Sequence, residues 1–385
     1  MKLLTGKTLK ETIRDFNEES WRVDALNYNE FLNKRCFNNN KNSFMDALYY
    51  LQKVVKYSPN KAINKRLTNQ TNINLVLEFY EKLGLREQVE PILLGNHPLF
   101  KTYINKKFVS QVAHRDVESK LIFMVGETGT FNGIINLVHE SAHAINGHYT
   151  KIQQFLKQQN EIVDNLGYKS KEFEKYKHSF NIYKSEQLSP KHDCITETET
   201  RIIELLFLDF LIDKNTISPE DKQTYIKQRH TGFRNDLKLM FQEDIIYSKI
   251  IEIKKENECH NAELTEEEYN EMCNRLKRNS HFKQIMDKFY FIANRKELNK
   301  LKLHSSYRFR YVVGEIISTV WYNKFTTANK KEKQQMIEDL KTFISNNNKL
   351  ELEDAIKILL KDLTYEDLVN QFAKIHKSKR EEITV

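Results

Sequence analysis

Hydrophobic residues recur at helical spacing through much of this 385-residue chain. Near its start, the apolar positions Phe44, Leu48, Leu51 and Val54 lie three or four residues apart, which predicts an amphipathic helix. Polar and Asn-rich patches separate such segments and predict loops. Because apolar stripes of this kind usually pack into a core, residues 1–115 are expected to form an N-terminal helical lobe.

One short segment has the pattern of a strand. Residues 121–125 form a compact run of branched and aromatic side chains that ends at Gly126. We expect this strand to belong to a small edge sheet. From Phe131 the apolar residues follow helical spacing as far as Gly147, so a strand is expected to lead through a short turn into a helix.

Polar and apolar segments alternate in the rest of the chain. Residues 150–192 are rich in Lys and Glu, whereas residues 195–212 and 311–325 are apolar enough to predict buried helices. No internal repeat is visible. Glycine and proline are also few, 10 and 5 residues, which disfavours folds with many turns such as sandwiches and barrels. The sequence therefore predicts a mainly α-helical protein.

Charge and cysteine content narrow the classes of partner. The formal net charge is +8, but basic and acidic residues are interspersed, so no clustered nucleic-acid-binding face is expected. Four cysteines without paired spacing are typical of reduced thiols. Neither a signal peptide nor a membrane-length apolar segment is recognisable, so we expect a cytoplasmic protein without membrane contact. Export by a route without a cleavable signal stays open.

The predicted helix that ends near Gly147 contains the strongest chemical motif. Residues 139–143, His-Glu-Ser-Ala-His, match the pattern H-E-x-x-H. Because residues four apart share a helix face, His139 and His143 can bind one Zn²⁺ per chain. Glu140 lies beside them and would act as the general base. A random chain of this composition would contain the pattern only about 0.03 times.

A catalytic zinc site takes three protein ligands, so one more is expected. The metzincin spacing does not apply, because Gly147 and His148 are each one position away from it. The other common arrangement uses a Glu from a later helix. The apolar helix near residue 195 is rich in acids at its start, and both Glu197 and Glu199 are candidates.

Three segments together resemble the M3 family of zinc oligopeptidases, most closely its oligoendopeptidase F branch. Residues 126–143 are similar to that branch's Thr-Gly-Thr turn and zinc helix, and this is the most specific match. Residues 197–204, Glu-Thr-Glu-Thr-Arg-Ile-Ile-Glu, resemble the family pattern E-x-x-S-x-x-x-E. Residues 304–314 resemble its late Tyr-rich segment. Ala142 departs from the family, which has Gly there.

The resemblance implies roles for individual residues. It makes Glu197 the third zinc ligand and Tyr311 the donor to the oxyanion of the tetrahedral intermediate. It also implies His304 as a second donor and Tyr307 as a substrate-side alternative. Glu204, two turns after Glu197, would either accept a hydrogen bond from a ligand imidazole or simply pair with a basic side chain.

The substrate is expected to lie along the turn before the zinc helix. There it would contact Gly126, Thr128 and Gly129 by adding a strand to an exposed edge. The 54 residues between His143 and Glu197 exceed the usual separation in the family, so residues 150–192 look like an insertion that could cover or reshape the cleft.

The sequence as a whole predicts a zinc-dependent endopeptidase that hydrolyses oligopeptides, with residues 116–385 as its catalytic domain. Two alternatives stay open: a protease specialised for a protein target, and a catalytically weak M3-like binding protein that keeps the fold. A pure binding protein would have no need of Glu140. Neither the scissile sequence nor the oligomeric state is predicted.

Overall fold

The computed structural model describes residues 51, 55, 63, 68–106, 110–115, 120–126, 129–187, 190–237, 305–347, 350, 352–361 and 363–381. The chain divides into two compact units, Met1–Leu48 with Arg234–Phe309, and Tyr49–Phe233 with Arg310–Val385. Almost all of the described residues belong to the second unit, and the elements below are those of that unit, with α13 beginning just before it.

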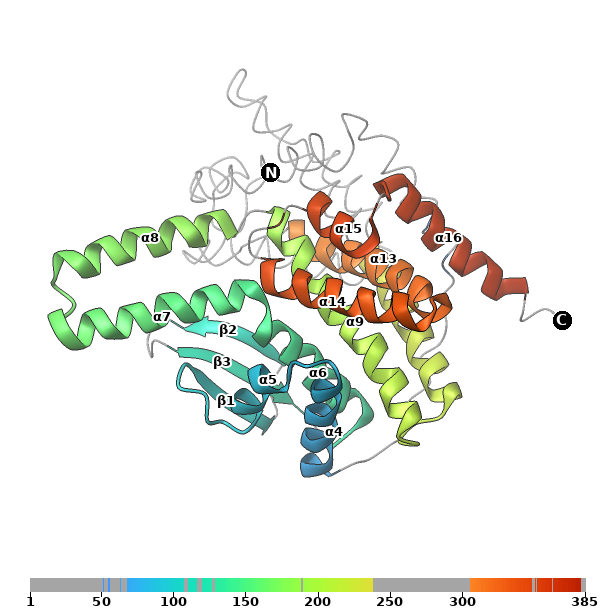
Figure 1. Ribbon diagram of the computed structural model, residues 1–385, viewed down its shortest axis with the longest axis horizontal. Coiled ribbons are helices and arrows are strands. Elements are labelled where there is room, and N and C mark those ends of the chain that lie inside the picture. The colour runs from blue at the N-terminus through green and yellow to red at the C-terminus, as the bar shows by residue number, and fades with distance from the viewer. Residues whose placement is uncertain are drawn as a thin grey trace, which may run out of the picture. The chain divides into compact units, whose positions relative to one another are not determined.

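Most of the described residues are helical, which confirms the prediction of a mainly α-helical protein (Figure 1). None of the described helices is both long and apolar enough to cross a membrane. The helices are α4 (Asn69–Lys82), α5 (Arg86–Leu93), α6 (Phe131–Ile145), α7 (Gly147–Leu166), α8 (Lys171–Gln187), α9 (Pro190–Asp213), α13 (Ser305–Thr327), α14 (Lys330–Asn346), α15 (Leu352–Leu360), α16 (Tyr365–Glu381) and an unlabelled segment over 219–237.

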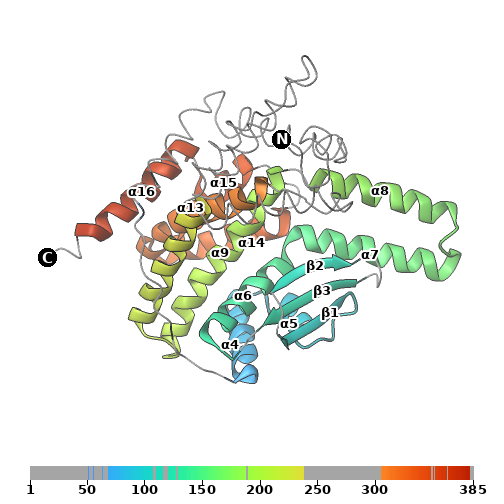
Figure 2. The same ribbon diagram turned by 180° about the vertical axis from the view of Figure 1, so that it is seen from behind.

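A three-stranded sheet lies beside these helices. Its strands are β1 (Phe100–Lys106), β2 (Gln111–Arg115) and β3 (Lys120–Gly126), in the order β1-β3-β2 (Figure 2). β1 runs parallel to β3 and β2 runs antiparallel to it. The predicted strand at 121–125 is therefore confirmed, and it lies in the centre of the sheet.

The helical prediction for residues 1–115 is wrong where β1 and β2 lie. Both strands are short, and their hydrogen-bonding partner is β3, which comes later in the chain. Strand formation of this kind depends on the neighbouring strand more than on local propensity. The local spacing of apolar residues therefore could not predict these two strands.

The strand β3 leads into α6, as the sequence predicts. Thr130 caps the N-terminus of α6, because its side chain accepts a hydrogen bond from the backbone N–H of Gly133. α6 packs against β3 on one side and against α9 on another. Most of its residues are buried, including Leu137, Val138 and Ala142. The H-E-x-x-H segment therefore lies on a helix that is held from several directions.

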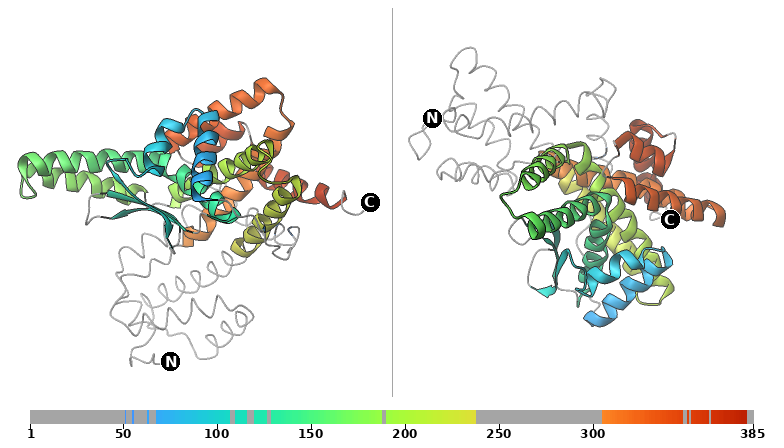
Figure 3. Two further views of the ribbon diagram at one scale, coloured as in Figure 1. Left: turned by 90° about the horizontal axis from the view of Figure 1, so that it is seen from below. Right: turned by 60° about the vertical axis from the view of Figure 1, so that its left-hand side comes forward.

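The polar segment 150–192 forms helices. α7 and α8 lie side by side as an antiparallel pair, which Figures 1 and 3 show from different directions. Gly167 ends α7 with a positive φ of 77°, a backbone conformation that glycine adopts without strain. Aromatic contacts join the two helices. The ring centroids of Phe155 and Phe180, for example, lie 5.2 Å apart.

The two predicted apolar helices are α9 and α13. In α9 the residues Ile202, Ile203, Phe207 and Leu208 are fully buried. α13 approaches α9 very closely at Gly314, where an added Cβ would lie 3.0 Å from the Cβ of Glu197. The absence of a side chain at Gly314 therefore sets the separation of the two helices at this point.

Candidate metal centre

Two imidazoles and one carboxylate meet where α6 packs against α9. His139 and His143 lie one turn apart on α6, with ring centroids 4.8 Å apart. The Nε2 atom of His139 lies 3.8 Å from Oε2 of Glu197, and Nε2 of His143 lies 3.7 Å from Oε1. Among the described residues, these three form a cluster that could hold a metal ion, with one ligand atom of each within 4.8 Å of the others.

The cluster fits a zinc ion in both spacing and donor type. Atoms bound tetrahedrally at about 2.0–2.1 Å from zinc lie about 3.3–3.4 Å apart, so small side-chain rotations close the difference. Two imidazoles with one carboxylate are a common catalytic zinc set that leaves one position open. Oε2 of Glu197 is buried and has no hydrogen-bond partner among the described residues. Buried carboxylate oxygens usually have a partner, so a cation would satisfy this one.

Glu204 supports the ring of His139 from the side opposite to Glu197. Its Oε1 lies 2.6 Å from Nδ1 of His139, so Nε2 is the ring nitrogen directed at Glu197. Burial lowers the pKa of His139, but the hydrogen bond and charge of Glu204, with the charges of Glu197 and Glu140, outweigh burial and raise that pKa to about 9. An acceptor behind a ligand imidazole fixes its tautomer and orientation.

The other role considered for Glu204, pairing with a basic side chain, is present as well. Nη1 of Arg229 lies 3.3 Å from Oε2 of Glu204, and the hydroxyl of Tyr225 donates to the same oxygen at 3.0 Å. Burial alone would raise the pKa of Glu204. The charge of Arg229 and the hydrogen bond of His139 outweigh it and lower that pKa to about 2.

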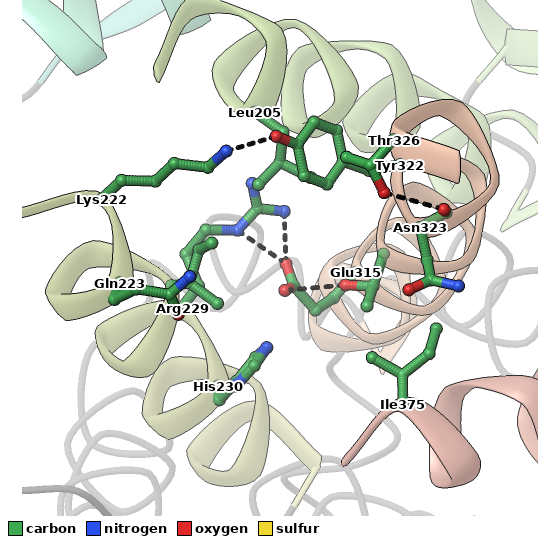
Figure 4. A pocket seen from close by; sticks show the side chains of 12 residues that line it. Leu205, Lys222, Gln223, Arg229, His230, Glu315, Tyr322, Asn323, Thr326 and Ile375 are labelled. Atoms are coloured by element: carbon green, nitrogen blue, oxygen red, sulfur yellow. Dashed lines mark hydrogen bonds and ion pairs between the residues drawn. The ribbon is translucent and has the colours of Figure 1, made fainter. Parts of the chain in front are cut away.

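A second buried carboxylate, Glu315 on α13, completes this network of charges. Nε and Nη2 of Arg229 donate to Oε2 of Glu315 at 3.1 and 2.7 Å (Figure 4), and Nη1 of Arg201 donates to the same oxygen at 2.6 Å. Burial would raise the pKa of Glu315, but the charges of the two guanidinium groups lower it to about 2. The network therefore joins α9, the segment 219–237 and α13.

A cavity of about 210 Å³ adjoins this network and is separate from the metal cluster. Arg229, Glu315 and Tyr322 are among the residues that line it (Figure 4), whereas none of the described lining residues is His139, His143 or Glu197. Arg229 donates four hydrogen bonds to Glu315, Ser318 and the carbonyl of Arg201, and its Nη1 also lies 3.3 Å from Oε2 of Glu204. The guanidinium is thus engaged by acceptors of the protein.

Glu199 occupies a different environment from Glu197. It is fully buried, and its Oε1 accepts hydrogen bonds from the side-chain amides of Asn146 and Asn347. Burial raises its pKa well above the usual value, because it disfavours the ionised form. Because residues two apart point to nearly opposite sides of a helix, only Glu197 faces the imidazoles.

Tyr311 of α13 contacts two arginines, Arg310 of the same helix and Arg201 of α9. Nη2 of Arg310 donates to its phenol oxygen at 3.1 Å, and the guanidinium of Arg201 lies over its ring, 5.4 Å from the centroid. Nε of Arg310 lies 3.5 Å from Oε1 of Glu197. One guanidinium therefore connects the phenol to the metal cluster.

The remaining predicted residues are placed only in part. His304 and Thr128 lie outside the described residues, and Tyr307 is described only as a position in α13. Gly126 pairs with Lys106 of β1, and its N–H donates to Oγ of Ser110 at 3.2 Å. Its contact with a substrate stays a prediction. Gly129 lies in the turn before α6.

Sequence reasoning missed the side chains that support the cluster, namely Arg229, Glu315 and Arg310. Arg229 lies in a charged helical segment without a motif, whereas Arg310 lies within the Tyr-rich segment 304–314 and Glu315 directly follows it. The resemblance assigned no role to either residue. Gly314 had a usable signal, because an isolated glycine inside an apolar helix often marks a close approach.

Comparisons with known proteins leave the family open. No protein-family model matches the chain, and no curated protein sequence matches it. Among solved structures, it is similar to that of a "putative peptidase" from Chlamydophila abortus, with 14% sequence identity and a TM-score of 0.39. The match covers 94% of this chain and 57% of that protein. A likeness of this degree identifies no family, so the function has to be argued from the chemistry of the site.

Proposed function

We propose that this protein is a zinc-dependent endopeptidase. The observation that carries the proposal is the convergence of His139, His143 and Glu197 from two helices, with Glu140 on the same helix as the histidines. The two imidazoles and the carboxylate would hold the ion. A bound zinc ion would supply a Lewis acid and a water molecule of lowered pKa.

Glu140 would be the general base. It is buried, with 7% of its surface exposed, and its charge acts on His139, so the carboxylate lies close to the cluster. In this position it can take a proton from the attacking water and deliver it to the leaving amine. A protein that only binds a metal would have no need of a carboxylate at this position of the H-E-x-x-H motif.

Tyr311 would donate a hydrogen bond to the oxyanion. Its connection to Glu197 through Arg310 supports this role, since it brings the phenol into the surroundings of the cluster. A donor that meets charge only as it develops stabilises the transition state more than the substrate.

The proposed substrates are oligopeptides, in line with the resemblance to zinc oligopeptidases. The helical pair α7 and α8 follows the zinc helix directly and is the insertion that could reshape access to the site. A protease restricted to one protein target is the alternative that this insertion favours.

The proposal is tested by incubating the purified chain with a quenched-fluorescent peptide library. Wild type is compared with Glu140→Gln, with a chelator-treated sample, and with Glu161→Gln, a matched substitution at an exposed position of α7. We expect Glu140→Gln to lower kcat by about 10²–10⁴-fold while one zinc ion per chain is retained. Chelation should abolish hydrolysis, and Glu161→Gln should leave it unchanged.

Hydrolysis by Glu140→Gln at the wild-type rate would contradict the proposal. Absence of cleavage by the wild-type protein, with one zinc ion bound, would instead support a binding protein or an enzyme limited to a protein target. Incubation with folded proteins, read out by mass spectrometry of the fragments, separates those two outcomes.

A further inference from the structure

The guanidinium of Arg310 contacts two groups that the proposed reaction would use. Its Nη2 donates to the phenol oxygen of Tyr311 at 3.1 Å, and its Nε lies 3.5 Å from Oε1 of Glu197. The side chain is largely buried, with 22% exposed. The contact with the phenol is a hydrogen bond and the contact with Glu197 is an ion pair. Because the guanidinium is planar and rigid, one group can restrain the phenol relative to the carboxylate.

The contact with Arg310 uses Tyr311 as an acceptor. The donating atom belongs to the cation, so this hydrogen bond does not consume the phenolic proton. A hydroxyl that accepts a hydrogen bond from a cation is polarised and becomes a stronger donor through its own proton. The arrangement therefore suits a phenol that must donate to an anion.

The packing of α13 on α9 directs Tyr311 towards the same region. Gly314 lies so close to Glu197 that an added Cβ would be 3.0 Å from the Cβ of Glu197, and Tyr311 lies three residues earlier, on the same face of α13. On α9, Arg201 lies four residues after Glu197, on the same face, and its guanidinium lies over the ring of Tyr311. The guanidinium groups of Arg201 and Arg310 thus both lie over the ring, and Arg310 also donates to the phenol oxygen.

We infer that Arg310 is a positioning residue that orients and polarises the phenol of Tyr311 for the oxyanion of the proposed peptidase reaction. The inference depends on the proposed function. A different role for the same contacts would be to compensate the charge of Glu197 alone. The two roles differ in what they change: the first affects kcat through Tyr311, whereas the second affects metal binding.

A double-mutant cycle separates the two roles. The variants are Arg310→Met, Tyr311→Phe, the double variant and Arg310→Lys, with Arg86→Met on α5 as a matched change at an exposed ion pair. Measurements are kcat and KM on the best-cleaved library peptide, zinc per chain, and the Kd of a phosphinic analogue of that peptide, which mimics the tetrahedral intermediate.

We expect Arg310→Met to lower kcat by about 10–100-fold, with KM changed by less than about threefold and one zinc ion retained. The double variant should be close to Tyr311→Phe alone, because the arginine acts through the phenol. Arg310→Lys should restore only part of kcat, since one ammonium cannot reproduce the fork. The phosphinic peptide should bind Arg310→Met more weakly, in proportion to the loss of kcat/KM, and Arg86→Met should match wild type.

Three outcomes would overturn the inference. Additive effects of the two substitutions in an active enzyme would show that Arg310 does not act through Tyr311. If Arg310→Met lost zinc in proportion to its loss of kcat, the arginine would act by compensating the charge of Glu197 instead. Absence of peptide hydrolysis by the wild type would remove the proposed function, and this inference with it.

Discussion

Three glutamates of α9 show how position decides the chemistry of one residue type. Glu197 faces two imidazoles, Glu199 faces two asparagine amides, and Glu204 lies between His139 and Arg229. Burial raises the pKa of Glu199, whereas Arg229 and His139 outweigh burial and lower that of Glu204 to about 2. Within two turns of one helix, the environment thus favours a protonated acid at one position and an ionised one at another.

Matched Glu-to-Gln changes test the assignment of the third ligand. We expect Glu197→Gln to weaken zinc binding by at least about 100-fold, because a neutral amide replaces an anionic ligand. Glu199→Gln should keep one zinc ion per chain, since the carboxyl group of Glu199 is bound by the amides of Asn146 and Asn347 and does not face the imidazoles. Zinc is measured by mass spectrometry and by competition with a chromophoric chelator. Loss of zinc from Glu199→Gln alone would move the ligand two residues along the helix.

At the scale of elements, the site depends on how closely α13 approaches α9. An added Cβ at Gly314 would lie 3.0 Å from Cβ and 3.1 Å from the backbone carbon of Glu197. The backbone of a helix cannot yield as a flexible side chain can, so the two helices would have to separate. The position of the proposed ligand Glu197 is thus set by a residue more than a hundred positions away.

The same substitution at two helical glycines tests this dependence. Gly314→Ala should lower the free energy of unfolding by about 1–3 kcal/mol and weaken zinc binding, because it displaces Glu197. Gly232→Ala, in the helical segment 219–237, has no heavy atom within 4 Å of the added Cβ. It should be neutral or stabilising by up to about 1 kcal/mol. Urea denaturation and zinc competition measure both effects, and equal behaviour of the two variants would refute the close-packing argument.

At the scale of the whole described unit, buried charges link the helices around the site. Glu204 and Glu315 lie among Arg201, Arg229 and His139, and the network spans α9, α13 and the segment 219–237. Removing one member of a buried pair leaves an uncompensated charge, which costs far more than the pair contributes to stability. The network is therefore expected to dominate the response of the fold to acid.

The substitution Glu315→Gln tests how the stability of the fold depends on pH. Since the pKa of Glu315 falls from 4.5 in the unfolded chain to about 2 in the fold, its contribution to stability is complete above pH 4.5. That contribution is lost as the pH falls from about 4.5 towards 2. At pH 7 the variant should be less stable by about 3–5 kcal/mol, because two guanidinium groups lose their counter-charge.

The difference between Glu315→Gln and wild type should then shrink in acid. Urea denaturation at pH 7, 5, 4 and 3, followed by circular dichroism, measures this difference, with the exposed Glu161→Gln as control. A difference that stays constant down to pH 4 and below would show that the ionised form of Glu315 is not what stabilises the fold.

How far the sequence predicts this protein depends on whether a feature is local. The spacing of His139 and His143 and the helix that carries them follow from one segment, and so does β3 with its branched and aromatic side chains. The buried helices α9 and α13 were visible as apolar runs for the same reason. By contrast, β1 and β2 were read as helical, because their strand conformation depends on pairing with a later segment.

The sequence by itself therefore determined the mainly helical class, the helix with its histidine pair and Glu140, and the short list of acids that could complete the cluster. Only the tertiary structure decided that Glu197 rather than Glu199 faces the imidazoles, that Arg310 contacts Glu197, and that Arg229 contacts Glu204 and Glu315. The physical reason is that helix geometry alone sets contacts between residues four apart. Contacts between residues fifty or a hundred apart depend on how the helices pack, and that is an outcome of the whole fold.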